Sequence, residues 1–178
     1  MPGHLNVEIK ARSENHDQIR LMLCEQGAEY KGLDHQIDTY FKVERGRLKL
    51  REGSIEKNLI YYERDDQEGP KESKVILYPF RENMVVEIGT LKEILTRTQG
   101  VLAVVDKQRE IYFVDNVKFH LDVVADLGRF VEIEAIDRRG DIGRERLLEQ
   151  CTKYMNLFQI RNDDLVSKSY SDMLLERR

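Results

Sequence analysis

The chain has only two cysteines among its 178 residues, and it contains no Cys-x-x-Cys and no His-x-x-x-His spacing. Cys24 and Cys151 lie far apart, each in a segment with a helical pattern, so a disulfide framework is excluded. We expect both thiols to be buried and reduced. The missing spacings also exclude a structural zinc site of the usual kind.

Long apolar runs are absent as well. No stretch approaches the 18 residues that a membrane-spanning helix needs, and the first residues do not resemble a signal peptide. No P-loop, dinucleotide-binding or Ser-His-Asp pattern stands out. Together with reduced cysteines, these absences predict a cytoplasmic protein that uses none of these common motifs.

Net positive charge is also missing. The formal net charge is −4 and the pI is near 5.7, which argues against a nucleic-acid or membrane-surface partner. Charged residues nevertheless make up 35% of the chain, more than the usual quarter, so many of them must be solvated, paired or functional. The length and the absence of repeats or linkers predict one domain over residues 1–178.

Eight segments have strand patterns, and most of the connections between them are too short for parallel crossovers. We therefore expect a mainly antiparallel sheet. The predicted strands are residues 5–12, 36–43, 47–52, 58–64, 73–79, 101–114, 117–124 and 130–136.

Four segments have helical patterns. Ser13 can cap a helix that ends at Gly27, Thr90 has capping-box spacing for a second helix, and Asp141 can cap a third. The predicted helices are residues 13–26, 90–99, 141–154 and 169–176.

Charged and apolar residues alternate along several of these strands. In the first one Glu8 and Lys10 share a face with Asn6 and Arg12, opposite the apolar Val7, Ile9 and Ala11. The plainer interpretation is a sheet with one solvated face. Eight strands are also enough to close a barrel, and closure would place the charged face inside. The other charged positions of this pattern are Arg47, Lys49, Arg51, Lys107, Arg109, Lys118, His120, Asp122, Glu132 and Glu134.

Six segments in order resemble the CYTH superfamily, also called triphosphate tunnel metalloenzymes. Asn6-Val7-Glu8-Ile9-Lys10 is similar to its Glu-x-Glu-x-Lys signature, and the ending 168–174 resembles the class IV adenylyl cyclase-like branch. The remaining matches are Asp38-Thr39-Tyr40-Phe41, Leu48-Lys49-Leu50-Arg51, Lys107-Gln108-Arg109 and the block 120–134.

The resemblance implies an α+β fold, a closed antiparallel eight-stranded β-barrel that forms a triphosphate tunnel, with flanking helices. It implies Mg²⁺ or Mn²⁺ as cofactor, held by Glu8, Asp122, Glu132 and Glu134, with the alternative that Asp122 orients a neighbouring cation. Glu8 and Lys10 would be catalytic. The implied phosphate-binding residues are Lys10, Lys49, Arg51, Arg64, Lys107 and Arg109.

Other polar and aromatic positions have weaker support. Arg12 and Arg47 have the right alternation without a clear motif, and Lys74 is no better than a solvated charge. Tyr40 and Tyr62 are interpreted first as packing residues, although either could border an organic group. A strand histidine such as His120 is interpreted first as structural, with acid–base work as the alternative.

The resemblance also implies a divalent-metal-dependent enzyme whose partner is a triphosphate-containing small molecule such as ATP. The favoured reaction is that of a class IV adenylyl cyclase, from ATP to cyclic AMP and pyrophosphate. One alternative is a triphosphatase that hydrolyses inorganic triphosphate, thiamine triphosphate or a nucleoside triphosphate. Asn6 replaces the first signature Glu, and this loss of a carboxylate keeps a non-catalytic binder as another alternative. A homodimer follows by analogy with class IV cyclases.

Overall fold

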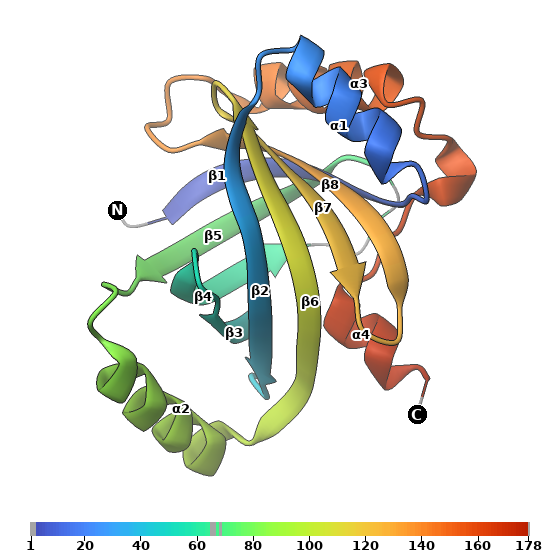
Figure 1. The fold of residues 1–178 in the computed structure, drawn as a ribbon. Coiled ribbons are helices and arrows are strands. Elements are labelled where there is room, and N and C mark those ends of the chain that lie inside the picture. Colours follow the sequence, from blue (N-terminus) through green and yellow to red (C-terminus); the bar gives the residue numbers. More distant parts are fainter. Residues whose placement is uncertain (1–2, 65–66, 68, 178) are drawn as a thin grey trace.

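A single sheet of eight antiparallel strands forms the body of the computed structural model, which describes residues 3–64, 67 and 69–177. Within these residues the sheet closes into a barrel in the order β1-β5-β4-β3-β2-β6-β7-β8 (Figure 1). The predicted fold class is therefore confirmed. The strands are β1 (Gly3–Arg12), β2 (Glu29–Phe41), β3 (Arg47–Glu52), β4 (Lys57–Arg64), β5 (Lys71–Pro79), β6 (Val101–Val114), β7 (Val117–Val124) and β8 (Gly128–Asp137).

Strand β2 begins seven residues before the predicted start at residue 36. The added residues pair with β6, and the pairing register shifts between Tyr30 and Gly32. Gly32 has φ +127°, a conformation that other residues rarely adopt. This bulge interrupts the two-residue alternation that marks a strand in sequence, so the pattern alone missed the extension.

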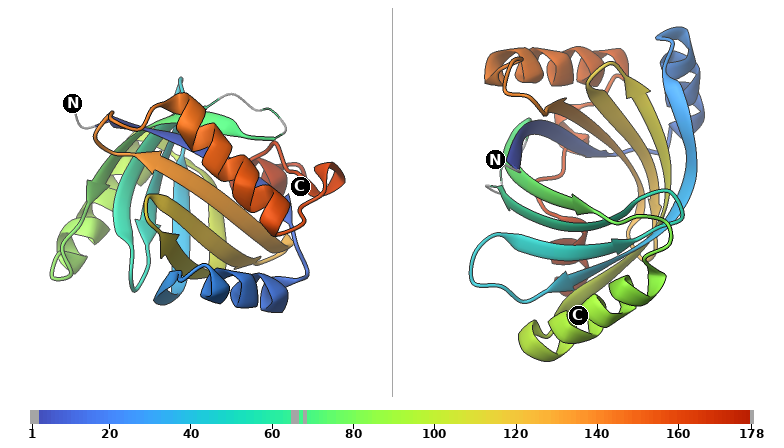
Figure 2. Two further views of the ribbon diagram at one scale, coloured as in Figure 1. Left: turned by 90° about the horizontal axis from the view of Figure 1, so that it is seen from above. Right: turned by 90° about the vertical axis from the view of Figure 1, so that its left-hand side faces the viewer.

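Four α-helices flank the barrel within the described chain: α1 (His16–Glu25), α2 (Val85–Gln99), α3 (Arg144–Leu157) and α4 (Tyr170–Leu175). A short 3₁₀ turn, Asn162–Asp164, lies between the last two. Figures 1 and 2 show α1 and α3 on one side of the barrel and α2 on the opposite side. The final helix is capped by Ser169, whose side chain accepts a hydrogen bond from the amide of Asp172.

Three predicted caps are wrong. Helix α2 begins five residues before Thr90, whose hydroxyl instead donates to the carbonyl of Val86. The residue before α3 is Gly143 rather than Asp141, and the turn there is organised by Asp137, whose carboxylate accepts four backbone hydrogen bonds from residues 140–143. Helix α1 begins at His16, three residues after Ser13. The helical spacing of apolar residues in the sequence predicted each of these helices. The polar residues near their starts predicted the wrong first residue.

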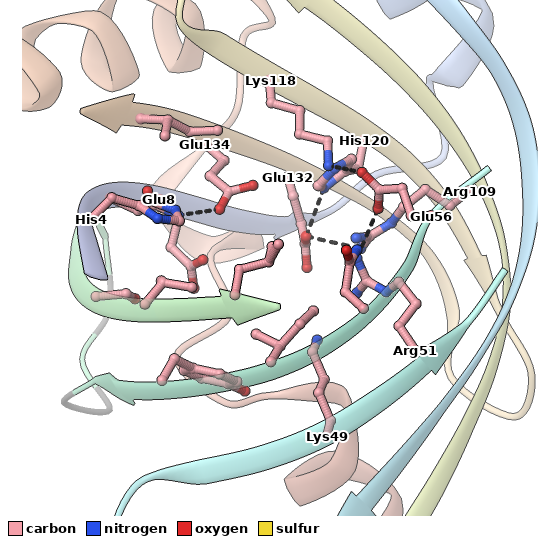
Figure 3. Close-up of a pocket in the computed structure, with 18 of the residues that line it drawn as sticks. His4, Glu8, Lys49, Arg51, Glu56, Arg109, Lys118, His120, Glu132 and Glu134 are labelled. Atoms are coloured by element: carbon pink, nitrogen blue, oxygen red, sulfur yellow. Dashed lines mark hydrogen bonds and ion pairs between the residues drawn. The ribbon is translucent and has the colours of Figure 1, made fainter. Parts of the chain in front are cut away.

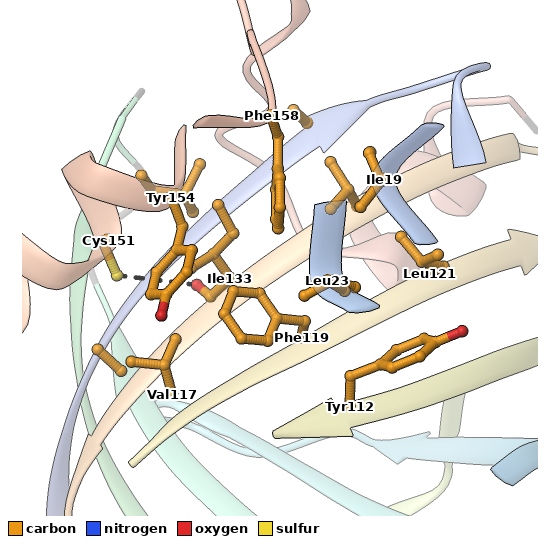
Figure 4. Close-up of a cluster of buried hydrophobic side chains, with 14 of the residues drawn as sticks. Ile19, Leu23, Tyr112, Val117, Phe119, Leu121, Ile133, Cys151, Tyr154 and Phe158 are labelled. Atoms are coloured by element: carbon orange, nitrogen blue, oxygen red, sulfur yellow. Dashed lines mark hydrogen bonds between the residues drawn. The ribbon is translucent and has the colours of Figure 1, made fainter. Parts of the chain in front are cut away.

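The main hydrophobic core lies outside the barrel, between helices α1 and α3 and the outer faces of β1, β7 and β8 (Figure 4). Phe119 is fully buried there, with its ring edge-on to Tyr154 and Phe158 at centroid distances of 4.7 and 5.6 Å. Cys151 donates its thiol to the carbonyl of Val7 at 3.0 Å, so its predicted burial is confirmed. Cys24 is exposed, and its predicted burial is wrong.

Smaller apolar clusters cover other outer faces. Ile88 of α2 packs with Phe41 and Leu50, which come from β2 and β3. None of the helices in the described residues is long and apolar enough to cross a bilayer. Because the apolar faces of the strands point outward under the helices, the charged faces are left to line the interior.

We predict that Phe119→Ala lowers the free energy of unfolding by about 3–5 kcal/mol, because it leaves a cavity between β7 and helices α1 and α3. Urea denaturation followed by circular dichroism measures the loss. The matched control is Val123→Ala on the same strand, where the side chain is 47% exposed. Its cost should stay within about 0.5 kcal/mol. Equal losses in the two variants would contradict this position of the core.

Candidate functional site

The interior of the barrel is a polar cavity of about 530 Å³, which we call the channel. Side chains from all strands contribute to its wall, with Glu8 and Glu134 on one side of it and Arg51 and Arg109 on the other (Figure 3). The charged side chains that line it include Glu8, Lys10, Lys49, Arg51, Glu56, Arg64, Lys107, Arg109, Lys118, Glu132 and Glu134. The structure thus brings nine of the ten predicted site residues to one cavity, and Asp122 is the tenth.

Asp38 holds three of the predicted phosphate-binding cations. Its carboxylate accepts from Arg51 Nε at 2.8 Å and Nη2 at 2.9 Å, from Lys107 Nζ at 2.7 Å and from Lys49 Nζ at 3.1 Å. Burial would raise the pKa of Asp38, but these three cations outweigh it and hold that pKa well below its usual range. Burial, with help from the neighbouring arginines, lowers the pKa of Lys107 to about 7 despite Asp38.

Asp122 lies behind Arg109 rather than in the channel wall. Its two oxygens accept from Arg109 Nε at 2.7 Å and Nη2 at 2.5 Å, and the hydroxyl of Tyr170 donates to it at 2.7 Å. Both oxygens are therefore engaged in a fully buried position. The structure favours the alternative role, in which Asp122 orients Arg109.

Glu132 faces the channel among three nitrogen groups. It lies 3.3 Å from Lys10 Nζ, 2.9 Å from Arg109 Nη2 and 3.0 Å from His120 Nδ1. Burial would raise the pKa of Glu132, but Arg109 and Lys10 hold it well below its usual range. Burial and the nearby cations lower the pKa of His120 to about 4, so this imidazole is neutral at pH 7. Its Nδ1–H then donates to Glu132.

A second group of carboxylates lies where β1 pairs with β8. Glu8 and Glu134 are directly opposite in this pairing, and Glu8 forms an ion pair with Arg64. Asn6 donates its amide to Glu134, while its own buried Oδ1 has no hydrogen-bond partner among the described residues. Burial, reinforced by Glu8 and Glu132, raises the pKa of Glu134 even though Lys118 opposes the shift. This part of the channel therefore favours an added cation.

The oxygen atoms of Asn6, Glu8 and Glu134 are of the kind that binds a divalent metal ion. Carboxylate and amide oxygens are the hard ligands that Mg²⁺ and Mn²⁺ prefer, and the free Oδ1 of Asn6 is one such donor. As the side chains stand, no three His, Cys, Asp or Glu residues of the described ranges are arranged to hold a metal. Glu8 and Glu132 are paired with cations instead, so binding would require them to exchange partners.

One end of the channel lies against the C-terminal segment. The backbone of Val166 donates to the carbonyl of Lys10 at 2.9 Å, and Lys71 Nζ donates to the carbonyls of Val166 and Ser167 at 2.6 and 2.9 Å. Lys10 Nζ also lies 3.9 Å from the centre of the Tyr170 ring. These contacts bring α4 and the residues before it to the channel wall, where Ser169 and Tyr170 contribute to the lining.

Sequence reasoning missed several residues in or beside the channel. Lys71, which donates to the C-terminal segment beside the channel, lies just before the predicted fifth strand, and its pKa is lowered to about 8, mainly by burial. Lys118 was visible in the alternation but received no role. Glu56 lies between two strands, where no periodic pattern marks it. Tyr40 and Tyr62, interpreted as packing residues, also line the channel.

A closed antiparallel barrel around a buried network of cations and carboxylates defines a tunnel protein. A model of the CYTH domain matches residues 4–170, so the chain belongs to the CYTH family. The resemblance seen in the sequence is thereby confirmed. No curated protein matches this sequence.

Solved structures with the same fold come from diverse organisms. A protein from Pyrococcus horikoshii superposes with a TM-score of 0.73 at 24% identity, over 94% of this chain and 98% of that one. An adenylate cyclase candidate from Vibrio parahaemolyticus gives 0.74 at 22%, over 97% and 99%. An adenylyl cyclase candidate from Hippeastrum, described as having a dominant triphosphatase activity, gives 0.62 at 14%, over 98% and 95%. At these identities the likeness shows the fold.

We predict that Asp38→Asn lowers the free energy of unfolding by about 3–5 kcal/mol, because it leaves Arg51 and Lys107 as buried cations without their main carboxylate. Urea denaturation at pH 7 measures the change. Asp106→Asn is the matched control, since Asp106 pairs with His35 at a half-exposed site on the outside of the barrel. A loss for Asp38→Asn below about 1 kcal/mol would show that the fold does not depend on this pairing.

Proposed function

We propose that this protein is an enzyme that acts on a triphosphate together with a divalent metal inside the channel. The observation that carries the proposal is the convergence of cations from five strands with partly buried carboxylates in one cavity of about 530 Å³. Isolated buried charges are costly, so a wall of this kind is stable only when its charges pair with one another or with a charged ligand. A polyphosphate chain with its metal supplies both signs.

The proposed roles follow the contacts. Lys10 Nζ lies 3.3 Å from Glu132 in the channel wall, and it would contact a phosphate oxygen while it keeps this pairing. Glu8, Glu132 and Glu134 would hold Mg²⁺ or Mn²⁺, which neutralises charge on phosphate oxygens when bound. The remaining cations would bind the non-bridging oxygens, with the arginines suited to two-point contact. They are Lys49, Arg51, Arg64, Lys107 and Arg109.

The first candidate reaction is that of a class IV adenylyl cyclase. The 3′-hydroxyl oxygen of ATP would attack the α-phosphorus and form a new P–O bond. The bond between the α-phosphorus and the oxygen that bridges it to the β-phosphorus would break, and pyrophosphate would leave with that oxygen. The resemblance of residues 168–174 to the cyclase-like branch and the likeness to the Vibrio structure support this choice.

The second candidate is hydrolysis. Water would attack the terminal phosphorus of inorganic triphosphate, thiamine triphosphate or a nucleoside triphosphate, and orthophosphate would be one product. The description of the Hippeastrum relative, a cyclase candidate with dominant triphosphatase activity, supports this alternative. A shared site can serve both reactions because the outcome depends on which phosphorus lies in line with the nucleophile.

Product analysis separates the two candidates. The purified protein is incubated with ATP, inorganic triphosphate and thiamine triphosphate, each with Mg²⁺ and with Mn²⁺. Cyclic AMP with pyrophosphate identifies the cyclase, and orthophosphate identifies the hydrolase. Binding of these compounds without turnover under every condition would refute the enzyme and leave the non-catalytic binder.

We predict that Glu8→Gln lowers metal-dependent turnover at least tenfold, because it removes a channel carboxylate and its charge while keeping the shape. Initial rates at saturating metal measure the effect. Glu72→Gln is the control, since Glu72 pairs with Arg144 on the outer surface and should leave the rate unchanged. Unchanged turnover in Glu8→Gln would remove Glu8 from the site.

We predict that Asn6→Glu tightens metal binding, because it adds a carboxylate beside Glu134 in a region that already favours a cation. The Mg²⁺ concentration that gives half-maximal turnover should fall, and Mg²⁺ should raise the melting temperature more than in the unaltered protein. If neither quantity changes, position 6 does not contact the metal.

A further inference from the structure

Glu56 reaches into the channel from the turn between β3 and β4. Its Oε2 accepts from Arg51 Nη1 at 2.9 Å and from Gln36 Nε2 at 3.1 Å, and its Oε1 is ion-paired with Lys118 (Figure 3). Arg51 lies on β3 and Lys118 on β7, which are separated in the barrel by β2 and β6. The carboxylate of Glu56 therefore bridges cations from two strands that are not neighbours in the sheet.

Hydrogen bonds to the side chain of Asp34 hold the turn that carries Glu56. This buried carboxylate accepts hydrogen bonds from the backbone amides of Ser54, Ile55 and Glu56 at 2.6, 2.9 and 3.0 Å. A Cβ at Gly53 would lie 2.6 Å from an oxygen of Asp34 and 2.7 Å from the carbonyl of Glu56, so the turn admits only glycine there without a shift. These contacts fix the backbone of residues 53–56, and this backbone positions the carboxylate of Glu56 beside Arg51 and Lys118.

The two cations that Glu56 engages form a compact anion site. Asp38 uses Nε and Nη2 of Arg51, so the contact to Glu56 uses the remaining nitrogen, Nη1. Arg51 and Lys118 are both at least nine-tenths buried. Burial would raise the pKa of Glu56, but Lys118 and Arg51 hold it well below its usual range, so the group stays charged. A carboxylate here satisfies the contacts that a phosphate oxygen would make.

We propose that Glu56 is a selectivity residue that closes the anion site of Arg51 and Lys118 to small anions such as orthophosphate. A single phosphate gains little beyond these two contacts, so it cannot offset the loss of the contacts of Glu56. A triphosphate also binds through the other cations of the channel, so it can offset the loss of the contacts of Glu56 when it takes up Arg51. The inference rests on the proposed function in one respect: both candidate reactions release a small phosphate product, which Glu56 would keep from being trapped.

The variant Glu56→Gln tests the proposal, because it keeps the shape of the side chain and removes its charge. Isothermal titration with orthophosphate, without metal, should show binding at least tenfold tighter than in the unaltered protein. Glu52→Gln is the matched control at the end of β3, since Glu52 pairs with Lys92 outside the channel, and it should bind as the unaltered protein does. Thermal melts confirm that all variants are folded.

A second variant locates the gained site. In the double variant Glu56→Gln/Lys118→Gln one of the two cations is lost, so the added affinity for orthophosphate should disappear. Orthophosphate binding that is unchanged or weaker in Glu56→Gln overturns the proposal, and so does a gain that survives in the double variant.

A parallel titration with inorganic triphosphate separates the two levels of inference. If the unaltered protein does not bind triphosphate, the proposed function fails, while a new orthophosphate site in Glu56→Gln still supports the selectivity role. If triphosphate binds and orthophosphate affinity does not change between the two proteins, only the role of Glu56 is overturned.

Discussion

Mutual pairing of buried cations and carboxylates is the constraint on which this structure depends. Asp38 pairs with Arg51, Lys107 and Lys49 at distances of 2.7–3.1 Å, and Asp122 and Glu132 both pair with Arg109. A closed barrel removes these groups from water, and each unpaired charge there would cost several kcal/mol. The strands must therefore meet in a register that places each cation against a carboxylate.

The apolar parts of the molecule follow from the same constraint. Because the inner face of the sheet is occupied by charge, hydrophobic burial has to occur on the outer face. Helices α1 and α3 supply the cover over β1, β7 and β8, with Phe119, Tyr154 and Phe158 packed edge to face. The barrel thus has a polar interior, and its main hydrophobic core covers part of its outer surface.

The carboxylates in and around the channel differ in burial and in the element that carries them, and we assign them different roles on this basis. Asp38 and Asp122 are fully or almost fully buried on strands and keep their arginines in place. Glu8, Glu132 and Glu134 have side chains that line the cavity, and in the proposed function they would hold the metal. Glu56 extends from a turn and covers a site that another anion could use. In the proposed function, this network would exchange partners with a metal-bound polyphosphate without leaving buried charges unpaired.

The sequence by itself determined which side chains share a face of one strand, such as Glu8 with Lys10 and Glu132 with Glu134, because alternation along a strand is local. That these strands meet around one cavity was implied only by the resemblance to the family. The sequence misjudged the starts of α1, α2 and α3, since Ser13, Thr90 and Asp141 have capping side chains that the chain uses differently. Only the tertiary structure decided that Asp122 lies behind Arg109, that Lys71 binds the C-terminal segment and that Glu56 reaches the channel. These placements depend on barrel closure and strand register, which bring together residues as far apart as Glu56 and Lys118. No local pattern encodes such a contact.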